Sequence, residues 1–502
     1  MNANLHHQIV ATLDDLSRAA LISPEHGSIS YRALLERAAR FANVLASVGL
    51  RPGDRLAAQI EKSVDAVALY LATVQAGGVF IPLNTGYTAA EVSYFLRDAE
   101  PAVIVLDPSK RRGLSSCIGE LKSVLLTLSQ TGSGSLVNMA ARAASEFTTI
   151  ERDKDDLAAI LYTSGTTGRS KGAMLTHGNL TSNGVTLRDL WQFSKNDVLI
   201  HALPIFHTHG LFVAINVTML ASASMVFLPK FDVGQVLHFM PQATCLMGVP
   251  TFYTRLLEDP LLTREITQHM RLFISGSAPL LSDTHHKWFD RTGHSILERY
   301  GMTEANMIAS NPYDGERLPG TVGLPLPDVS VRIANHEADQ ENSAADIGMI
   351  EVKGPNVFHG YWRMADKTAA DFRSDGYFVT GDMGRFDEHG YLHILGRSKD
   401  LIITGGFNVY PKEIEREIDL LPGIVESAVF GIPHADFGEA VIAAVVRRDE
   451  SSDGATIRSE LANKLARFKL PKEIVFLREL PRNAMGKVQK EQLRKNFLQQ
   501  FG

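Results

Sequence analysis

Residues 162–172 read Tyr-Thr-Ser-Gly-Thr-Thr-Gly-Arg-Ser-Lys-Gly and bring glycines, hydroxyl groups and cations together in one short segment. The three glycines let the backbone approach a ligand closely. The hydroxyls, the backbone N–H groups and the cations of Arg169 and Lys171 suit the segment to surround a polyphosphate. Its spacing is not that of a Walker A loop, because two residues separate Gly168 from Lys171 and no Gly-Lys-Ser/Thr occurs. The segment therefore predicts a phosphate-binding loop of another type.

The elements that position this loop are expected to alternate between strand and helix. Apolar residues recur at helical spacing over 31–50 and 64–75. Short apolar runs typical of buried strands lie at 56–60, 79–83, 102–106, 157–162, 198–202, 224–228, 245–249 and 272–275. This alternation predicts parallel βαβ units in an α/β fold, with helices on both faces of the sheet. Ligands of such sheets bind at the carboxyl ends of the strands, where the unusual loops of this sequence fall.

The pattern of the chain changes after about residue 395, where residues 396–400 form a polar joint. Beyond the joint we expect a helix over 412–420, paired strands at 427–431 and 440–446, a helix over 456–468 and a strand at 473–477. About 100 residues of mixed α and β structure predict a small separate domain. We therefore expect one domain over 1–397 and another over 398–502, with a hinge near Lys399.

Composition and length limit the class of protein. The 502 residues allow about three domains, or one large α/β domain with a small one. Fifty basic and 56 acidic residues give a net charge of −6, which argues against a general nucleic-acid binder. Cys117 and Cys245 alone exclude a disulfide scaffold and a Cys-rich zinc site. No apolar run approaches 18 residues and the N-terminus lacks a signal pattern, so we expect no membrane partner and a cytoplasmic location.

The 162–172 loop resembles the phosphate-binding signature of the adenylate-forming enzymes, which include acyl-CoA synthetases, adenylation domains of peptide synthetases and luciferases. Four further blocks resemble that family in its own order, at 299–304, 377–382, 396–411 and 481–487. Together the blocks cover nearly the whole chain. The resemblance implies a large N-terminal domain of parallel-type sheets flanked by helices that binds AMP and the acid. It also implies that the small α+β C-terminal domain is a mobile lid.

The same resemblance implies a site for ATP and Mg²⁺. Glu304 is a hard oxygen ligand suited to Mg²⁺. Asp382 is expected to accept hydrogen bonds from the ribose, and Arg397 to add a ribose or phosphate contact. The catalytic residues implied are Lys487, Glu304, Thr163 and Lys171. The nucleotide-binding residues implied are Thr163, Ser164, Gly165, Thr166, Thr167, Gly168, Lys171, Ser277, Ala278, Glu298, Arg299, Tyr300, Gly301, Thr303, Asp382 and Arg397.

The chemistry implied has two half-reactions. A carboxylate is a poor electrophile, and transfer to AMP provides a better leaving group, while cations offset the charge that builds at the α-phosphate. Lys487 is implied to reach the acid and the α-phosphate in this first step. The small domain then rotates about Lys399, and Gly405, Gly406 and Phe407 line a channel for the thiol of coenzyme A.

The choice of acid depends on Arg255, which lies one helical turn into an otherwise apolar segment at 247–257. Arg is rarely buried unpaired, and its planar fork suits the second carboxylate of a dicarboxylic acid. An ion pair with Glu258 or Asp259 is the alternative. The segments 203–211, 247–257 and 275–280 resemble the malonyl-CoA synthetases, which implies that Arg255 and Ser277 hold the distal carboxylate. The acid-binding residues implied are His207, Arg255, Ser277, Gly301 and Met302.

The sequence is also compatible with other functions. The enzyme could activate another short acid, with Arg255 in a structural ion pair, or load a separate carrier protein. A luciferase-like oxidation and a nucleotide sensor are further alternatives that the Arg255 segment and the intact Lys487 block disfavour. Methylmalonate adds one methyl group to malonate, so we expect partial tolerance of it. A lysine acetyltransferase acting on Lys487 would block adenylation and spare thioester formation.

Overall fold

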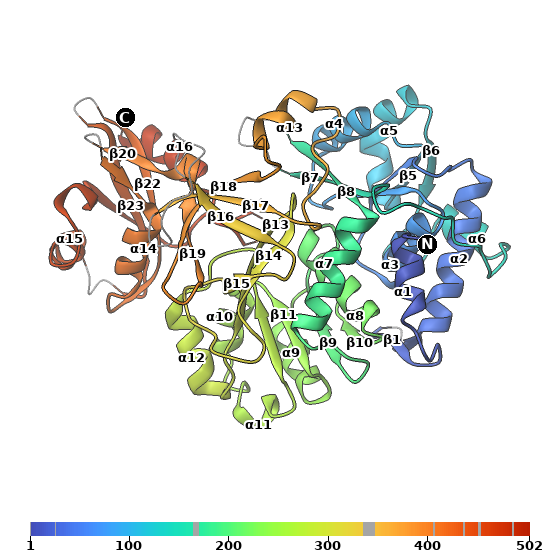
Figure 1. Cartoon of the computed structure of the whole chain (residues 1–502), viewed down its shortest axis with the longest axis horizontal. Helices are drawn as coiled ribbons and strands as arrows, with labels where there is room; N and C mark the ends of the chain where they lie inside the picture. Colours follow the sequence, from blue (N-terminus) through green and yellow to red (C-terminus); the bar gives the residue numbers. More distant parts are fainter. Residues whose placement is uncertain are drawn as a thin grey trace.

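Figure 1 shows the computed structural model of the chain. The structure describes residues 2–25, 27–163, 170–334, 347–404, 407–434, 437–449, 453–483 and 486–501, without the side chains of residues 408 and 499–501. None of the helices in these ranges is long and apolar enough to cross a membrane.

The largest sheet has nine strands, and its six central strands run parallel. Antiparallel strands extend it at both edges. This arrangement places the carboxyl ends of the central strands, and the loops that follow them, along one edge of the sheet. In sheet order the strands are β15 (Leu324–Pro325), β14 (Asn306–Ser310), β13 (Leu297–Met302), β12 (Leu272–Ser275), β11 (Cys245–Gly248), β9 (Val198–His201), β10 (Ser224–Phe227), β1 (Ala19–Ser23) and β2 (Gly27–Ser30).

A second sheet of six strands carries the predicted phosphate loop. Five of its strands are parallel, and the last pair is an antiparallel hairpin in which Thr163 stands opposite Lys171. In sheet order the strands are β6 (Val124–Thr127), β5 (Val103–Leu106), β3 (Arg55–Gln59), β4 (Val79–Pro82), β7 (Leu157–Thr163) and β8 (Lys171–Thr176). The strands and the parallel order expected from the sequence are thus present in both large sheets.

Helices cover these two sheets and fill the space between them. Every residue of α3 and of α8 is buried, and one apolar core joins side chains from both sheets. Side chains at the helix starts satisfy free backbone N–H groups, for example Ser63 at α3 and Thr176 at α7. The helices are α1 (Leu5–Ala11), α2 (Tyr31–Ser47), α3 (Val64–Gln75), α4 (Ala89–Ala99), α5 (Arg111–Glu120), α6 (Ser135–Ala140), α7 (His177–Leu190), α8 (Asn216–Leu220), α9 (Val233–Phe239), α10 (Pro250–Glu258), α11 (Arg264–Thr267), α12 (Ser282–Thr292) and α13 (Ala365–Asp371), with the short 3₁₀ turns η1 (Pro108–Lys110) and η3 (Met240–Gln242) and the π-helix η2 (His209–Ile215).

A third sheet, which the sequence reasoning did not anticipate, leads from the large sheets to the C-terminal part of the chain. It is a four-stranded antiparallel sheet of β16 (Ser330–Ala334), β17 (Gly348–Lys353), β18 (Phe378–Phe386) and β19 (Leu392–Arg397). The short turn η4 (Ser398–Asp400) follows its last strand and contains Lys399. The boundary predicted near Lys399 thus falls between two sheets, and its role as a hinge stays a prediction.

The C-terminal part forms the fourth sheet, on one side of the molecule in Figure 1. It contains β20 (Ile402–Thr404), β21 (Phe407–Val409), β22 (Ile424–His434), β23 (Gly438–Arg447) and β24 (Glu473–Leu477), with α14 (Pro411–Asp419), α15 (Gly454–Ala462), η5 (Arg467–Lys469) and α16 (Lys490–Phe501). The predicted α/β class with a small α+β domain is confirmed.

One predicted helix is shorter than expected. The helix expected over 456–468 ends at Ala462, because the chain turns to an extended conformation at Ala466. The turn η5 that follows stacks the ring of Phe468 on that of Phe407, with ring centroids 4.6 Å apart. Tertiary packing therefore overrides the helical periodicity here.

Candidate active site

The phosphate loop connects β7 to β8, and its first and last residues are described. Residues 164–169, which include the predicted contacts Ser164, Gly165, Thr166, Thr167 and Gly168, lie outside the described part of the chain. Thr163 is half-buried at the end of β7, and Lys171 is buried at the start of β8. The antiparallel pairing of these two residues closes the base of the loop.

Lys171 and Glu304 both contact Tyr361, Lys171 at the ring and Glu304 at the hydroxyl. The Lys171 ammonium lies 4.2 Å from the ring centroid of Tyr361, and the Tyr361 hydroxyl donates a hydrogen bond of 3.1 Å to Glu304 Oε1. Asp371 Oδ2 lies 4.0 Å from Lys171 Nζ. Burial lowers the pKa of Lys171 and raises the pKa of Glu304. The arrangement suits the two charged species of a metal–nucleotide complex, a phosphate for the lysine and a cation for the carboxylate.

Glu304 has the chemistry of a Mg²⁺ ligand. The carboxylate is buried, and within the described residues its recorded side-chain partner is the Tyr361 hydroxyl rather than a cation. No group of three or more metal-ligating side chains occurs in the described part of the chain. Mg²⁺ commonly uses one or two carboxylates together with substrate phosphates and water. A single buried carboxylate beside the phosphate loop therefore fits Mg²⁺ carried by a nucleotide.

Asp382, Tyr300 and Arg397 form the predicted ribose site. Asp382 and Arg397 stand opposite each other in the β18–β19 pair, and Arg397 Nε lies 2.8 Å from Asp382 Oδ1. The hydroxyl of Tyr300 donates to Asp382 Oδ2 at 2.5 Å. These contacts hold the carboxylate in one orientation, and its remaining lone pairs are available as acceptors.

Glu298 lies under the segment that contains Ser277 and Ala278. Its Oε1 accepts a hydrogen bond from the backbone N–H of Leu280 at 3.1 Å, while Oε2 has no hydrogen-bond partner among the described residues. Burial raises the pKa of Glu298 to about 8. A buried acceptor without a hydrogen bond destabilises the fold, so Glu298 is suited to accept a hydrogen bond from a ligand.

Arg299 lies on the opposite face of β13 from Glu298 and Tyr300, because side chains alternate along a strand. Its charge interacts with His207, His209 and Tyr253, and burial lowers its pKa to about 9. The guanidinium atoms Nε and Nη2 have no hydrogen-bond partner in the described part of the chain. The predicted contact of Arg299 with the nucleotide stays a prediction.

The predicted acid-binding region around Arg299 contains further polar atoms without partners among the described residues. His207 Nδ1, His209 Nε2 and Ser275 Oγ are buried and make no hydrogen bond to described residues. Ser277 contacts His209 Nδ1 at 3.2 Å and has a backbone φ of +71°, which is uncommon for a residue with a side chain. Gly301 and Met302, half-buried at the end of β13, continue the same strand. Burial and the nearby cation of Arg299 lower the pKa of His207 to about 4, so His207 is neutral.

Arg255 is exposed, contrary to the expectation that it is the buried cation of the pocket. The buried residues of α10 are Phe252, Tyr253 and Leu256, and helical geometry turns Arg255 out of that face. The structure records no ion pair of Arg255 with Glu258 or Asp259 in the described residues, so the alternative expectation is not met either.

Lys487 reaches the same region from the C-terminal part of the chain. Its charge interacts with Arg397, Asp382, Asp400 and Lys399, and with His207, which was predicted to contact the acid. Solvent reaches its side chain, yet the surrounding protein desolvates the ammonium and lowers its pKa to about 8. The preceding Gly486 lies against the first turn of α10. The structure thus brings together Lys487 with the residues that were predicted to surround ATP and the acid.

The remaining predicted residues lie away from this centre or outside the described chain. Gly405 and Gly406 of the predicted thiol channel are outside the described residues. Phe407 is 55% exposed and stacks on Phe468, and Lys399 is exposed in η4. Thr303 is half-buried beside Glu304. Sequence reasoning missed Tyr361, since an isolated aromatic residue after a glycine carries no signal of a contact 57 positions away.

Comparisons with known proteins show which family this chain resembles. A family model described as AMP-binding enzyme matches residues 11–362, and one described as AMP-binding enzyme C-terminal domain matches residues 413–487. A malonate–CoA ligase of Arabidopsis thaliana is 35% identical over 483 residues, with 89% of this chain and 79% of that protein covered. A feruloyl-CoA synthase of Amycolatopsis is 34% identical over 497 residues, with coverage of 96% and 98%.

A solved structure is more similar still. The crystal structure of ATP-bound MatB from Rhodopseudomonas palustris is 60% identical to this chain and covers 100% of both chains, with a TM-score of 0.98. That protein binds ATP within the same fold. Relatives at about 35% identity do not show which acid this chain activates, because a malonate ligase and a feruloyl-CoA synthase have nearly equal identity to it.

Proposed function

The chain belongs to the AMP-binding enzyme family, and from that membership we propose that it is a malonate–CoA ligase. It joins malonate to coenzyme A with cleavage of ATP to AMP and pyrophosphate, through malonyl-adenylate. Methylmalonate is accepted to a lesser extent, since one methyl group changes binding by only about 1–3 kcal/mol.

The observation that carries the choice of malonate is Arg299. A buried guanidinium with two nitrogens unpaired in the described structure costs free energy unless a ligand supplies an anion. The carboxylate that becomes adenylated must meet the α-phosphate and Lys487, so we assign the anion at Arg299 to a different group of the acid. A second carboxylate on the same acid meets both requirements. Ser277, which contacts His209 beside Arg299, adds a hydroxyl for it, and the exposed Arg255 attracts the dianion at the outer side of α10.

In the first half-reaction the acid attacks the α-phosphate and pyrophosphate leaves. The Lys487 ammonium orients the reacting carboxylate and offsets charge on the α-phosphate, and the phosphate loop with Lys171 holds the β- and γ-phosphates. Asp382 and Arg397 orient the ribose, and Glu298 accepts a hydrogen bond from the adenine amino group. Mg²⁺, held by Glu304 and the phosphates, supplies charge neutralisation when it is bound.

In the second half-reaction the thiol of coenzyme A attacks the carbonyl of malonyl-adenylate and AMP leaves. Lys487 has no role in this step, so its domain rotates about Lys399 and removes it from the site. Gly405, Gly406 and Phe407 then line the route of the thiol. The exposure of Phe407 and of Lys399 supports this assignment, because both are free to exchange neighbours when the domain turns.

The experiment that tests the function is pyrophosphate release with ATP, Mg²⁺ and coenzyme A over a panel of acids. The panel contains malonate, methylmalonate, succinate, acetate, propionate, octanoate and benzoate. We expect malonate to lead propionate by about 10⁴ in kcat/KM, because a buried cation rejects an acid that lacks its partner charge. A lead by a monocarboxylic acid would retain the ligase chemistry and refute the malonate assignment.

We also propose a cytoplasmic location and a control point at Lys487. The residue is exposed to solvent as a whole, so a lysine acetyltransferase is able to approach this segment. Acetylation removes the charge that adenylation needs. Protein with acetyl-lysine incorporated at position 487 is expected to form thioester from supplied malonyl-adenylate and to release no pyrophosphate from ATP. Normal pyrophosphate release by that protein would refute this control.

A further inference from the structure

Lys62 is a buried lysine that the reaction described above does not use. It lies between β3 and α3 with 7% of its surface exposed, and burial lowers its pKa well below the ordinary value. Its ammonium donates to His201 Nδ1 at 2.9 Å and to the His201 carbonyl at 2.8 Å, and lies 4.3 Å from the ring centroid of Phe227. The structure records no carboxylate partner for Lys62 within its described ranges. The contact joins the six-stranded sheet to the last residue of β9 in the nine-stranded sheet.

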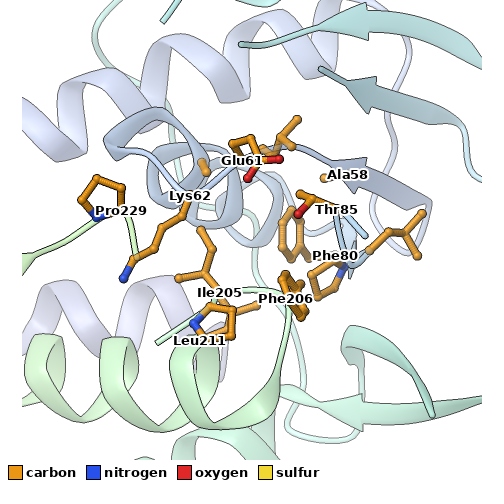
Figure 2. Close-up of a pocket in the computed structure, with 14 residues that line it drawn as sticks. Ala58, Glu61, Lys62, Phe80, Thr85, Ile205, Phe206, Leu211 and Pro229 are labelled. Carbon is orange, nitrogen blue, oxygen red and sulfur yellow. The ribbon is translucent and has the colours of Figure 1, made fainter. Parts of the chain in front are cut away.

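The ammonium of Lys62 serves His201 rather than a ligand in the neighbouring cavity. That cavity has a volume of about 100 Å³ and is bordered by Lys62, Phe80, Thr85 and Phe206 among others. Figure 2 shows the Lys62 nitrogen pointing away from Phe80 and Thr85, so its aliphatic stem lines the space. The two hydrogen bonds to His201 account for the direction of the charged group.

The partners of His201 fix its protonation. In a neutral His201 ring that donates through Nε2, Nδ1 is the acceptor, so Lys62 donates to it. The Gly210 carbonyl only accepts, so His201 Nε2, 2.8 Å away, carries the proton. Burial and the charge of Lys62 lower the pKa of His201 well below its ordinary value, in agreement with a neutral ring. Lys62 therefore selects the one tautomer that is able to hold Gly210.

Gly210 closes the segment that carries the histidines of the acid pocket. A β-carbon at Gly210 would stand 2.0 Å from the Pro204 carbonyl oxygen, so the segment 202–210 folds tightly back on itself. His207 and His209 both belong to this segment, and His209 Nδ1 contacts Ser277 at 3.2 Å. A continuous path thus runs from Lys62 through His201 and the Gly210 backbone to His209 and Ser277.

We propose that Lys62 is a positioning residue of the acid pocket: through His201 it fixes the 202–210 segment, and thereby His207, His209 and the His209–Ser277 contact. The inference rests on the proposed function in that it takes malonate as the acid. Two hydrogen bonds from one buried side chain, to Nδ1 and to the carbonyl of His201, restrict both the ring and the backbone at the start of this segment.

The test compares steady-state kinetics of Lys62→Met and Lys62→Arg with wild type. Met keeps an apolar stem of similar shape and removes the donor that selects the His201 tautomer. We expect KM for malonate to rise at least tenfold in Lys62→Met, KM for ATP to change less than twofold, and the malonate-to-propionate ratio of kcat/KM to fall at least tenfold. Lys62→Arg, which keeps charge and donors, is expected to recover most of the loss.

Tyr31→Phe is the matched control. The Tyr31 hydroxyl donates a buried hydrogen bond of 2.7 Å to the Ala223 carbonyl, beside β10 of the same sheet, and takes no part in the path to Ser277. Its removal is expected to lower the melting temperature without changing either KM. If Lys62→Met behaves like Tyr31→Phe, or raises both KM values equally, Lys62 is only structural and the inference is wrong.

Two further outcomes concern a variant that does not fold and a wild type that prefers another acid. If Lys62→Met does not fold, Lys62→Leu, which also removes the donor, is judged by the same KM criteria. If wild type prefers another acid, the proposed function fails by itself. The KM of that preferred acid then replaces the KM of malonate, and its selective rise in the variant still supports the positioning role.

Discussion

The guanidinium of Arg299 lies so close to Gly276 that a β-carbon on residue 276 would stand 2.5 Å from Arg299 Cζ. The two residues meet because β12 and β13 are parallel neighbours, with Ser275 opposite Glu298. Glycine at 276 leaves the space in which the cation sits. The buried cation of Arg299, which acts on His207, thus owes its place to a residue without a side chain.

Gly276→Ala is expected to displace Arg299 and to lower kcat/KM for malonate at least a hundredfold. The added methyl group requires a shift of the guanidinium, which has packed side chains on its other sides. Steady-state pyrophosphate release measures the effect. Gly119→Ala is the control, because a β-carbon at Gly119 in α5 meets open space, and full activity is expected there. Equal activities of the two variants would show that activity does not depend on the position of the Arg299 guanidinium beside Gly276.

Arg299→Met and Arg255→Ala should separate the two arginines of the acid site. We expect Arg299→Met to lose at least about 10³ in kcat/KM for malonate with little change for propionate, because only the dicarboxylate uses the buried cation. Arg255→Ala should lose no more than about tenfold, since an exposed charge is screened by water and salt. Measuring KM for malonate and KM for ATP in each variant shows whether the arginine binds the acid or the nucleotide. A large rise in KM for ATP alone in Arg299→Met would return Arg299 to the nucleotide site.

The adenylation step is expected to fail at high pH because of Lys487. The pKa of Lys487 is lowered to about 8, so the ammonium that adenylation needs is present below that pH and lost above it. We expect kcat/KM for ATP to fall about tenfold per pH unit above pH 8, since this parameter reports the free enzyme. Pyrophosphate exchange over pH 6–10 measures it.

Lys487→Ala is expected to remove the fall of kcat/KM for ATP above pH 8. It is also expected to lower the rate of adenylation by about 10²–10³, the usual effect of losing one stabilising donor. Thioester formation from supplied malonyl-adenylate should change less than threefold in the same variant. Lys495→Ala, at an exposed ion pair in α16, controls for loss of a surface lysine and should keep the wild-type profile. An unchanged pH limb in Lys487→Ala would assign the titration to another group.

Glu304→Gln is expected to abolish activity and to leave the free protein at least as stable as wild type. Burial raises the pKa of Glu304, so the charged form is disfavoured in the folded state and folding is less favourable once the pH exceeds the unfolded pKa. A neutral amide removes that cost and still accepts from Tyr361. Calorimetry without nucleotide gives the stability, and Mg²⁺ titration at fixed ATP gives the apparent metal affinity, which should fall at least tenfold.

The control for Glu304→Gln is Glu100→Gln, at an exposed ion pair with Arg363. That substitution should change neither metal affinity nor melting temperature, because exposed pairs contribute little. A lower melting temperature for Glu304→Gln together with unchanged Mg²⁺ affinity would assign Glu304 a structural role through Tyr361.

Features that depend on neighbours in the chain were predictable from the sequence. Helix α3 and strand β12 have the bounds that their apolar spacing predicted, because side-chain periodicity is a local property. The phosphate loop after β7 and the Lys487 segment near the C-terminus were recognised from residue types at short spacing. The family and its reaction follow from those segments.

Features that depend on which distant faces meet were decided only by the tertiary structure. The sequence predicts Arg255 at the acid and Arg299 at the nucleotide, and only the outward turn of α10 and the burial of β13 show that Arg299 is the buried one. Lys62 and His201 are 139 positions apart, and their contact exists because two sheets pack together. Burial and partner choice are properties of packing between elements, and the free energy of a charge depends on them far more than on its neighbours in the chain.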